Sequence, residues 1–204
     1  DSGFEASYKF AIESQIPENL AVVIERPDLY LVSCNGQPVQ AKPGDWWLDK
    51  AFGRIPIAKL AHPGENVVTI VASPFTMFHE LEPAYLIGDF TLLPGPRGFT
   101  ILPDQPLRLG GENCRGWNSQ GHPFYGAAVR YTEKFEVPKK TGRYSVALPR
   151  WYGTIAEVKV NGKAAGYIDA PPWEKDVTKW LKRGQNNIEV AVYGTLKNTL
   201  GPHH

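Results

Sequence analysis

Residues 154–168 read T-I-A-E-V-K-V-N-G-K-A-A-G-Y-I, and residues 181–192 read L-K-R-G-Q-N-N-I-E-V-A-V. In the first stretch, Asn161-Gly162 lies between two strand-like runs and supplies the positive φ angles of a tight hairpin turn. In the second, a G-x-N turn precedes a run rich in β-branched residues, in which Glu189 alternates with apolar neighbours. Such alternation is typical of a strand with one buried face. The two stretches predict a β-sheet unit in the C-terminal half.

The same succession of signals occurs earlier, where residues 29–39 read L-Y-L-V-S-C-N-G-Q-P-V and residues 60–71 read L-A-H-P-G-E-N-V-V-T-I-V. The anchors in order are an Asn-Gly hairpin, a Trp with an Asp shortly after it, a leucine that ends a short segment, and a Gly-x-Asn turn. They are Asn35-Gly36 and Asn161-Gly162, Trp47 with Asp49 and Trp173 with Asp176, Leu60 and Leu181, and Gly64-x-Asn66 and Gly184-x-Asn186. Because an internal repeat indicates a repeated structural unit, we expect two tandem β-sandwiches in an all-β chain.

The rest of the chain agrees with this organisation. Further strands are expected at residues 8–12 and 20–25 in the first copy, and at residues 131–137 and 144–148 in the second. Helices are limited to about one turn each at residues 58–61 and 177–182, the second capped by Asp176. The Pro- and Gly-rich residues 93–106 break the periodicity and predict a linker. The expected domains are therefore residues 1–100 and 101–204.

Composition narrows the classes of function. The 204 residues carry a net charge of +1 with no run of like charges, which argues against a nucleic-acid footprint and against a membrane-surface protein. No apolar run is long enough to predict a transmembrane helix. Two cysteines are too few for a disulfide scaffold, so Cys34 and Cys114 either form one long-range bridge or remain separate buried thiols. The sequence leaves both states open.

The second copy resembles a known family over residues 124–193. Its order of strand, V-N-G, P-P-aromatic, D-V-T, L-x-x-G-x-N and strand is similar to the sugar-binding β-sandwich of family 2 glycoside hydrolases and to β-sandwich modules of rhamnosidase-like enzymes. This resemblance implies a jelly-roll, galactose-binding-like fold for the tandem units. The first copy is a more distant match, because I-P-I-A at residues 55–58 replaces the usual D-hydrophobic-T.

The resemblance also implies a role outside catalysis. In such enzymes a (β/α)₈ barrel or a helical toroid performs the chemistry, and this β pattern contains neither. We therefore expect a non-catalytic carbohydrate-binding module of a larger glycoside hydrolase, secreted or in the cell envelope. Its partners would be a polysaccharide or oligosaccharide and the catalytic domain of the same parent chain. The alternative is a structural or interface sandwich that has no ligand of its own. No cofactor is expected, and a structural Ca²⁺ stays open.

Aromatic side chains are the candidate binding residues, because sugars present apolar C–H faces flanked by hydroxyl groups. The candidates are Trp46, Trp47, Trp117, Tyr125, Trp151, Tyr152 and Trp173. Trp46 and Trp47 are adjacent, so in a strand one ring points inward and the other outward. Trp117 is expected in a loop beside Arg115, Asn118 and Gln120. Trp173 and Trp180 are expected to pack in the core or at an interface. If the two copies have different functions, we expect a new function in the divergent residues 46–57.

The acidic residues that could suggest a catalytic role are Glu80, Glu82 and Asp89. In a strand, Glu80 and Glu82 would share one face about 7 Å apart, a separation that any i, i+2 pair reaches. We therefore expect solvated or loop-anchoring roles for them. The five histidines show no H-E-x-x-H or C-x-x-C context, so a catalytic zinc is unsupported.

Overall fold

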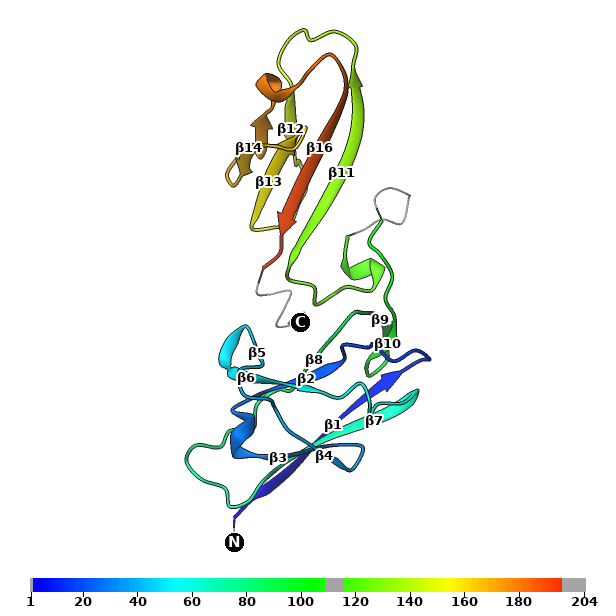
Figure 1. Cartoon of the computed structure of the whole chain (residues 1–204), viewed down its shortest axis with the longest axis vertical. Helices are drawn as coiled ribbons and strands as arrows, with labels where there is room; N and C mark the ends of the chain where they lie inside the picture. The colour runs from blue at the N-terminus through cyan, green and yellow to red at the C-terminus, as the bar shows by residue number, and fades with distance from the viewer. Residues whose placement is uncertain (1, 109–115, 196–204) are drawn as a thin grey trace. The chain divides into compact units, whose positions relative to one another are not determined.

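The structure is a computed structural model that describes residues 2–108 and 116–195. The chain divides into two compact units, residues 1–107 and 108–204, each built from β-strands with short 3₁₀ turns (Figure 1). The all-β fold expected from the sequence is therefore confirmed. The expected boundary at residue 100 is wrong, because it falls inside a strand of the first unit that extends to Pro103.

The first unit is a sandwich of two sheets. One sheet has the strand order β4-β3-β7-β1-β10-β9 and the other β5-β6-β2-β8. Their bounds are β1 Phe4–Ile12, β2 Ala21–Glu25, β3 Leu31–Cys34, β4 Gln37–Val39, β5 Trp46–Trp47, β6 Asp49–Pro56, β7 Gly64–Ala72, β8 Tyr85–Ile87, β9 Phe90–Gly95 and β10 Gly98–Pro103. Alternating side chains of β7 and of facing strands fill the space between the sheets, where Val22, Val68 and Ile55 are fully buried. Burial of this apolar surface is the main force that holds the sheets together.

The Pro- and Gly-rich residues 93–106 do not form the linker that we expected. They supply most of the β9–β10 hairpin, in which Pro94 pairs with Phe99 and Gly98 pairs with Gly95. β10 then continues in parallel register beside the end of β1, with Ile12 opposite Ile101. Gly98 takes a φ of 106°, which glycine adopts without the steric cost of a side chain. The glycines and prolines that suggested a linker therefore serve a tight turn and an edge strand.

The second unit repeats the central part of this arrangement. Its main sheet has the order β11-β16-β13-β14, and a two-stranded sheet of β12 and β15 covers part of one face. The bounds are β11 Ala128–Val137, β12 Ser145–Ala147, β13 Ile155–Val160, β14 Lys163–Ile168, β15 Glu174–Asp176 and β16 Gly184–Tyr193. β11 and β16 run side by side along the sheet (Figure 1). The strand neighbours β14-β13-β16-β11 correspond to β4-β3-β7-β1 of the first unit, and all of these pairs are antiparallel.

A pair of asparagines explains why the first unit needs Asn-Gly and Gly-x-Asn at fixed places. The Asn35 side chain donates to Leu60 O and to Asn66 Oδ1, both at 2.9 Å, while its own Oδ1 accepts from Val67 N. Asn66 is fully buried and also bonds to the backbone N and O of His62. Buried amides are stable only when their hydrogen bonds are satisfied. The pair therefore ties the hairpin to the start of β7.

The second unit contains the same network, bond for bond. Asn161 donates to Trp180 O and to Asn186 Oδ1, and its Oδ1 accepts from Asn187 N. Asn186 is buried and bonds to the backbone N and O of Lys182. Asn161 has a φ of 52°, beside 49° for its counterpart in the first unit, so both hairpins have the positive φ angles predicted from Asn-Gly.

Within residues 2–108 and 116–195, helical structure is limited to three short 3₁₀ turns, η1 at Pro27–Leu29, η2 at Asn118–Gln120 and η3 at Thr178–Trp180. η3 lies where a helical turn was expected, and Asp176 Oδ1 accepts a hydrogen bond from the Thr178 backbone. Residues 58–61 form a hydrogen-bonded turn in which Ala61 N donates to Ile57 O. No helix within the described residues is long and apolar enough to span a membrane.

Cys34 is a free thiol that is fully buried in the core of the first unit, and burial raises its pKa above the ordinary value. Cys114 lies outside the described residues. A buried, neutral thiol behaves as a small apolar side chain. Cys34 therefore contributes to the packing of the first unit.

Candidate functional site

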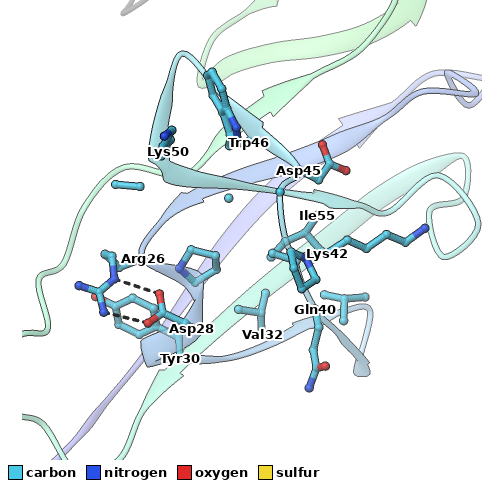
Figure 2. A pocket seen from close by; sticks show the side chains of 17 residues that line it. Arg26, Asp28, Tyr30, Val32, Gln40, Lys42, Asp45, Trp46, Lys50 and Ile55 are labelled. Atoms are coloured by element: carbon cyan, nitrogen blue, oxygen red, sulfur yellow. Dashed lines mark hydrogen bonds and ion pairs between the residues drawn. The ribbon is translucent and has the colours of Figure 1, made fainter.

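A groove of about 460 Å³ opens at one edge of the first unit (Figure 2). It lies where the edge strand of one sheet, β4, and the edge strand of the other, β5, meet the η1 turn. Residues 40–45 cross from β4 to β5 and form one wall. Val32 and Ile55, whose side chains belong to the core, line its inner end. The groove is thus a place where the sandwich edge stays open beside its core.

Two small residues of β6, Ala51 and Gly53, line this edge of the groove. Gly53 is opposite Trp46 in the β5–β6 pair and opposite Ile24 in the β2–β6 pair, and it has no side chain to fill the edge. A Cβ atom added there would lie 2.4 Å from the ring of Pro27 and 3.3 Å from Cβ of Ala41. The two walls therefore approach the β6 backbone closely, and only glycine permits that approach.

The rim beside Trp46 is a strained hairpin. Leu48, at its tip, has a φ of 65° although it is neither glycine nor asparagine, and its side chain is exposed. A left-handed conformation costs an ordinary residue about 1–2 kcal/mol. The register of the pair shifts between Trp46 and Trp47, which is a bulge-like irregularity. Bulges re-aim side chains at sheet edges, and here the irregularity separates the directions of the two indoles.

Trp46 and Trp47 have different surroundings, as their alternation in a strand predicted. The Trp46 side chain lines the groove and is 47% exposed. Within residues 2–108 and 116–195 it has no aromatic partner. Trp47 is half-buried and packs on Tyr85, which in turn contacts Phe52. Trp46 is therefore the free ring of the pair, whereas Trp47 belongs to an aromatic cluster.

Both carboxylates that line the groove already hold a guanidinium group. Arg26 binds Asp28 through two hydrogen bonds of 3.0 and 2.8 Å, drawn as dashed lines in Figure 2, and it lowers the Asp28 pKa. Arg54, which approaches from outside the lining, lies 3.4 Å from an oxygen of Asp45. These pairs are solvated, so each contributes little to stability. Their consequence is that the acidic oxygens of the groove are occupied.

Two lysines in the groove lining remain without a carboxylate. Lys42 projects from the wall that connects β4 to β5, and Lys50 projects from the same hairpin as Trp46 (Figure 2). Among the described residues neither forms an ion pair. The sequence motifs single out none of Lys42, Lys50 and Arg26. Lys50 lies within the divergent residues 46–57, whereas Lys42 and Arg26 lie outside them, so no sequence signal marks those two.

Trp117 and Tyr125 lie together in the second unit, as an edge-to-face pair with ring centroids 5.7 Å apart. The indole Nε1 of Trp117 donates a 2.6 Å hydrogen bond to the hydroxyl of Tyr131, so its polar atom is already engaged. Tyr125 is more exposed and contacts His122. Arg115, which the sequence placed beside Trp117, lies outside the described residues. The loop brings aromatic rings together with their polar tips turned toward protein partners.

Trp151 and Trp173 are packed in the second unit. Their rings meet edge to face at 5.6 Å, and both lie against the core that includes Val158 and Leu181. Trp173 reaches this position with a φ of 60°. Trp180 packs on the same core and carries the ammonium group of Lys179 over its ring at 4.1 Å. Core packing, expected for Trp173 and Trp180, thus extends to Trp151.

Tyr152 differs from these tryptophans because its side chain is 97% exposed. It follows Trp151 directly in an irregular segment between β12 and β13. Tyr152 is therefore the most exposed of the aromatic candidates and lies in the other unit from Trp46.

The acidic residues considered for catalysis do not lie on a strand. Glu80 and Glu82 belong to the exposed loop between β7 and β8, and Asp89 lies in the turn before β9. The loop is held through its backbone, because Tyr30 Oη donates to Glu80 O and Tyr8 Oη donates to Glu82 O. The premise that the glutamates share a strand face is therefore wrong. Within the described residues, no three His, Cys, Asp or Glu side chains are grouped to hold a metal ion.

Comparison with known proteins gives one relative in sequence. The chain is 30% identical over 95 residues to the "Putative beta-glucuronidase" of Formosa agariphila. The alignment spans 44% of this chain and 8% of that protein, so the similarity concerns a small part of a much larger protein. No family model matches the sequence.

The solved structures that resemble this chain include two rhamnosidases. The alpha-L-rhamnosidase of Streptomyces avermitilis, complexed with L-rhamnose, aligns with a TM-score of 0.40 and 16% identity over 94% of this chain and 22% of its own. A rhamnosidase from a Novosphingobium species aligns with a TM-score of 0.36 and 18% identity over 97% of this chain and 18% of its own. The chain spans less than a quarter of either enzyme.

Proposed function

We propose that this chain is a non-catalytic, carbohydrate-binding part of a larger glycoside hydrolase, and that it binds saccharide in the groove of the first unit. The observation that carries the proposal is the exposed indole of Trp46 at the rim of a groove that also offers amide and ammonium donors. An aromatic ring can stack on the C–H face of a sugar while polar neighbours bind its hydroxyl groups. The proposal involves no metal or cofactor.

Two further points support the accessory role. The sequence relative carries the name of a glycosidase, and the matched segment is 8% of its length. The Asn-Gly and Gly-x-Asn anchors serve the buried hydrogen-bond networks of the two units rather than a site. We propose that both units are repeats of one galactose-binding-like module. We also propose that the catalytic domain is another part of the parent chain, and that the parent protein acts outside the cell or in its envelope.

The proposal is tested by titrating the full chain with soluble β-glucan, xylan, mannan and pectin by calorimetry and affinity gel electrophoresis. Binding to at least one polymer is expected, and Trp46→Ala is expected to weaken it by about ten-fold or more, as loss of an aromatic anchor does. The control is Tyr152→Ala, which removes a more exposed aromatic ring from the other unit. If no polymer is retained, or if only Tyr152→Ala weakens binding, the groove is not a sugar site.

An interface role is the second candidate, because the β7–β8 loop exposes a group of apolar side chains. Phe75, Met77, Phe78 and Leu81 are all exposed, and Met77 is 89% exposed. Exposed apolar groups of this kind mark interaction surfaces. If a neighbouring domain of the parent chain covers the loop, the loop amides should exchange hydrogen more slowly in the parent protein than in this chain alone. Equal exchange in both would remove this candidate.

Catalysis by the chain itself is tested separately. The exposed, loop-borne positions of Glu80 and Glu82 give no pair of carboxyl groups facing each other across a cleft. We expect no hydrolysis of aryl glycosides by the purified chain. Turnover that disappears in Glu82→Gln would contradict the non-catalytic role.

A further inference from the structure

We propose that the groove of the first unit selects a saccharide that carries negative charge, through the ammonium groups of Lys42 and Lys50 beside the Trp46 ring. The inference rests on the proposed function, since it names the class of saccharide that the same groove takes. The shared chemistry is an anionic oxygen group on the sugar, either the carboxylate of a uronic acid or a sulfate ester.

The charge balance of the groove points to an anion. Its lining includes three cations and two carboxylates, Arg26, Lys42 and Lys50 against Asp28 and Asp45, so 3 − 2 leaves one positive charge. Asp45 also pairs with Arg54 from outside the lining, so within the described residues Lys42 and Lys50 are the charged side chains of the lining that have no ion-pair partner.

The hydrogen-bonding groups of the groove favour the same class of ligand. A site for a neutral sugar needs acceptors for hydroxyl protons, and carboxylates are the usual strong acceptors. Here the oxygens of Asp28 accept two bonds from Arg26, and Asp45 is paired as well. An ammonium group can only donate, and its bonds to ionised oxygens are stronger than those to neutral ones. The charged groups of the lining that have no ion-pair partner among the described residues are thus donors matched to an anion.

The geometry allows one ligand to use both the ring and a charge. Trp46 and Lys50 project from the same short hairpin, whose tip Leu48 is held in a left-handed conformation (Figure 2). Lys42 comes from the connecting wall, and its side chain extends away from Trp46 and Lys50 (Figure 2). A sugar stacked on the indole would therefore have Lys50 as its near donor, and Lys42 would meet a charge farther along the same saccharide. The sequence motifs do not predict this pair of lysines, because the motifs specify only the strands and their turns.

The experiment measures binding of the full chain to polygalacturonate, to a sulfated galactan and to neutral galactan, at low and at high NaCl. We expect one of the two anionic polymers to bind at least ten-fold more tightly than the neutral polymer. That preference should shrink as salt screens the exposed charges. Preference for polygalacturonate assigns the carboxylate, and preference for the sulfated polymer assigns the sulfate ester.

Variants connect the preference to the groove. Lys42→Gln and Lys50→Gln should each weaken binding of the preferred polymer by about two- to five-fold, and the double variant by about ten-fold. The matched control is Lys59→Gln, an exposed lysine of the same unit outside the groove, which should leave binding unchanged. An equal effect of Lys59→Gln would mean diffuse attraction and overturns the inference.

The two proposals fail in different ways. If neutral galactan binds as tightly as the anionic polymers, and binding depends on Trp46 but not on the lysines, the charge selection is wrong while the sugar site remains. If no polymer binds, or binding does not depend on Trp46, the proposed function fails and the inference fails with it. A far-ultraviolet circular dichroism spectrum and a melting curve of each variant verify that it is folded.

Discussion

The segment that follows the Asn-Gly hairpin separates the two units more clearly than any other. In the second unit it runs from β14 to Trp173, whose ring turns inward onto Trp151 and the core. In the first unit it runs along residues 40–45 to Trp46 and Trp47. The ring of Trp47, the counterpart of Trp173 in the repeat, is half-buried, whereas the ring of Trp46 stays at the rim of an open groove. The same frame can therefore close its edge with an indole or leave it open. Four changes test how far this comparison extends, in order of decreasing expected effect.

The buried asparagines should matter equally in both units. Asn66→Ala and Asn186→Ala each remove an amide that satisfies several buried backbone groups, at an expected cost of about 3 kcal/mol in the free energy of unfolding. Amide hydrogen exchange should then rise in β3 and β7 for the first variant and in β13 and β16 for the second. Asn187→Ala is the control, since its Oδ1 has no hydrogen-bond partner among the described residues. A small effect of Asn66→Ala beside a large effect of Asn186→Ala would break the equivalence of the units.

Trp173→Gly should destabilise the second unit by about 2 kcal/mol. The loss of a half-buried indole from the core outweighs the relief of its left-handed backbone, for which φ is 60°. Thermal unfolding followed by fluorescence, with exchange to locate the change, measures the effect. Trp46→Gly is the comparison, and it should cost clearly less because that ring is half exposed. Similar losses in both variants would contradict the inward and outward assignments.

Leu48→Gly should act in the opposite direction and stabilise the first unit by about 0.5–1 kcal/mol. The exposed Leu48 side chain gives up little packing, and glycine removes the cost of its φ of 65° while adding some freedom to the unfolded chain. Chemical denaturation gives the difference. A loss of stability would show that the hairpin depends on the leucine side chain. Binding that weakens while stability rises would indicate that the strained tip positions Trp46 and Lys50.

The smallest effect concerns two aspartates whose pKa values are lowered for different reasons. Asp28 is held mainly by Arg26, whereas Asp176 is held mainly by the side-chain and backbone groups of Thr178. A lowered pKa in the folded state means that the ionised carboxylate stabilises the fold. This stabilisation is complete at pH values above the pKa of the unfolded chain, and it is lost as the pH falls through the pKa of the folded state. The two pKa values can be measured by carboxyl NMR titration at low and at high salt. Added salt should raise the pKa of Asp28 more than that of Asp176, because salt screens the ion pair between Arg26 and Asp28. Equal shifts would contradict this distinction.

Local sequence signals were sufficient for the frame. The Asn-Gly turns, the Gly-x-Asn turns and the alternating strands are short-range patterns, and each appears in the structure where the sequence placed it. The β9–β10 hairpin was missed because proline and glycine serve both linkers and edge strands, and only its pairing with β1 distinguishes the two. The strand assumed for Glu80 and Glu82 failed because the loop is held by tyrosine hydroxyl groups from distant strands.

The candidate site, too, could be predicted only in part from the sequence. The sequence selected Trp46 and the divergent residues 46–57, since a ring at an alternating position in a drifted segment is visible in the chain itself. It could not select Lys42, Lys50 and Arg26, because lysine and arginine are common on every surface. Only the folded structure brings these residues together, in the groove where two sheet edges and the η1 turn meet. Likewise, only the packing distinguishes Trp47, Trp151 and Trp173 from Trp46.

By itself the sequence determined the β-strands, their turns and the correspondence of the two halves, because hairpin turns and strand alternation are decided by neighbours in the chain. The tertiary structure decided which indoles are buried and which carboxylates are paired. It also decided where the sandwich edge stays open, in the groove beside Gly53, onto which Pro27 and Ala41 pack closely. These outcomes depend on residues far apart in sequence that meet only when the sheets pack. The physical reason is that burial and charge pairing are properties of the folded surface, whereas turn geometry is a property of the local backbone.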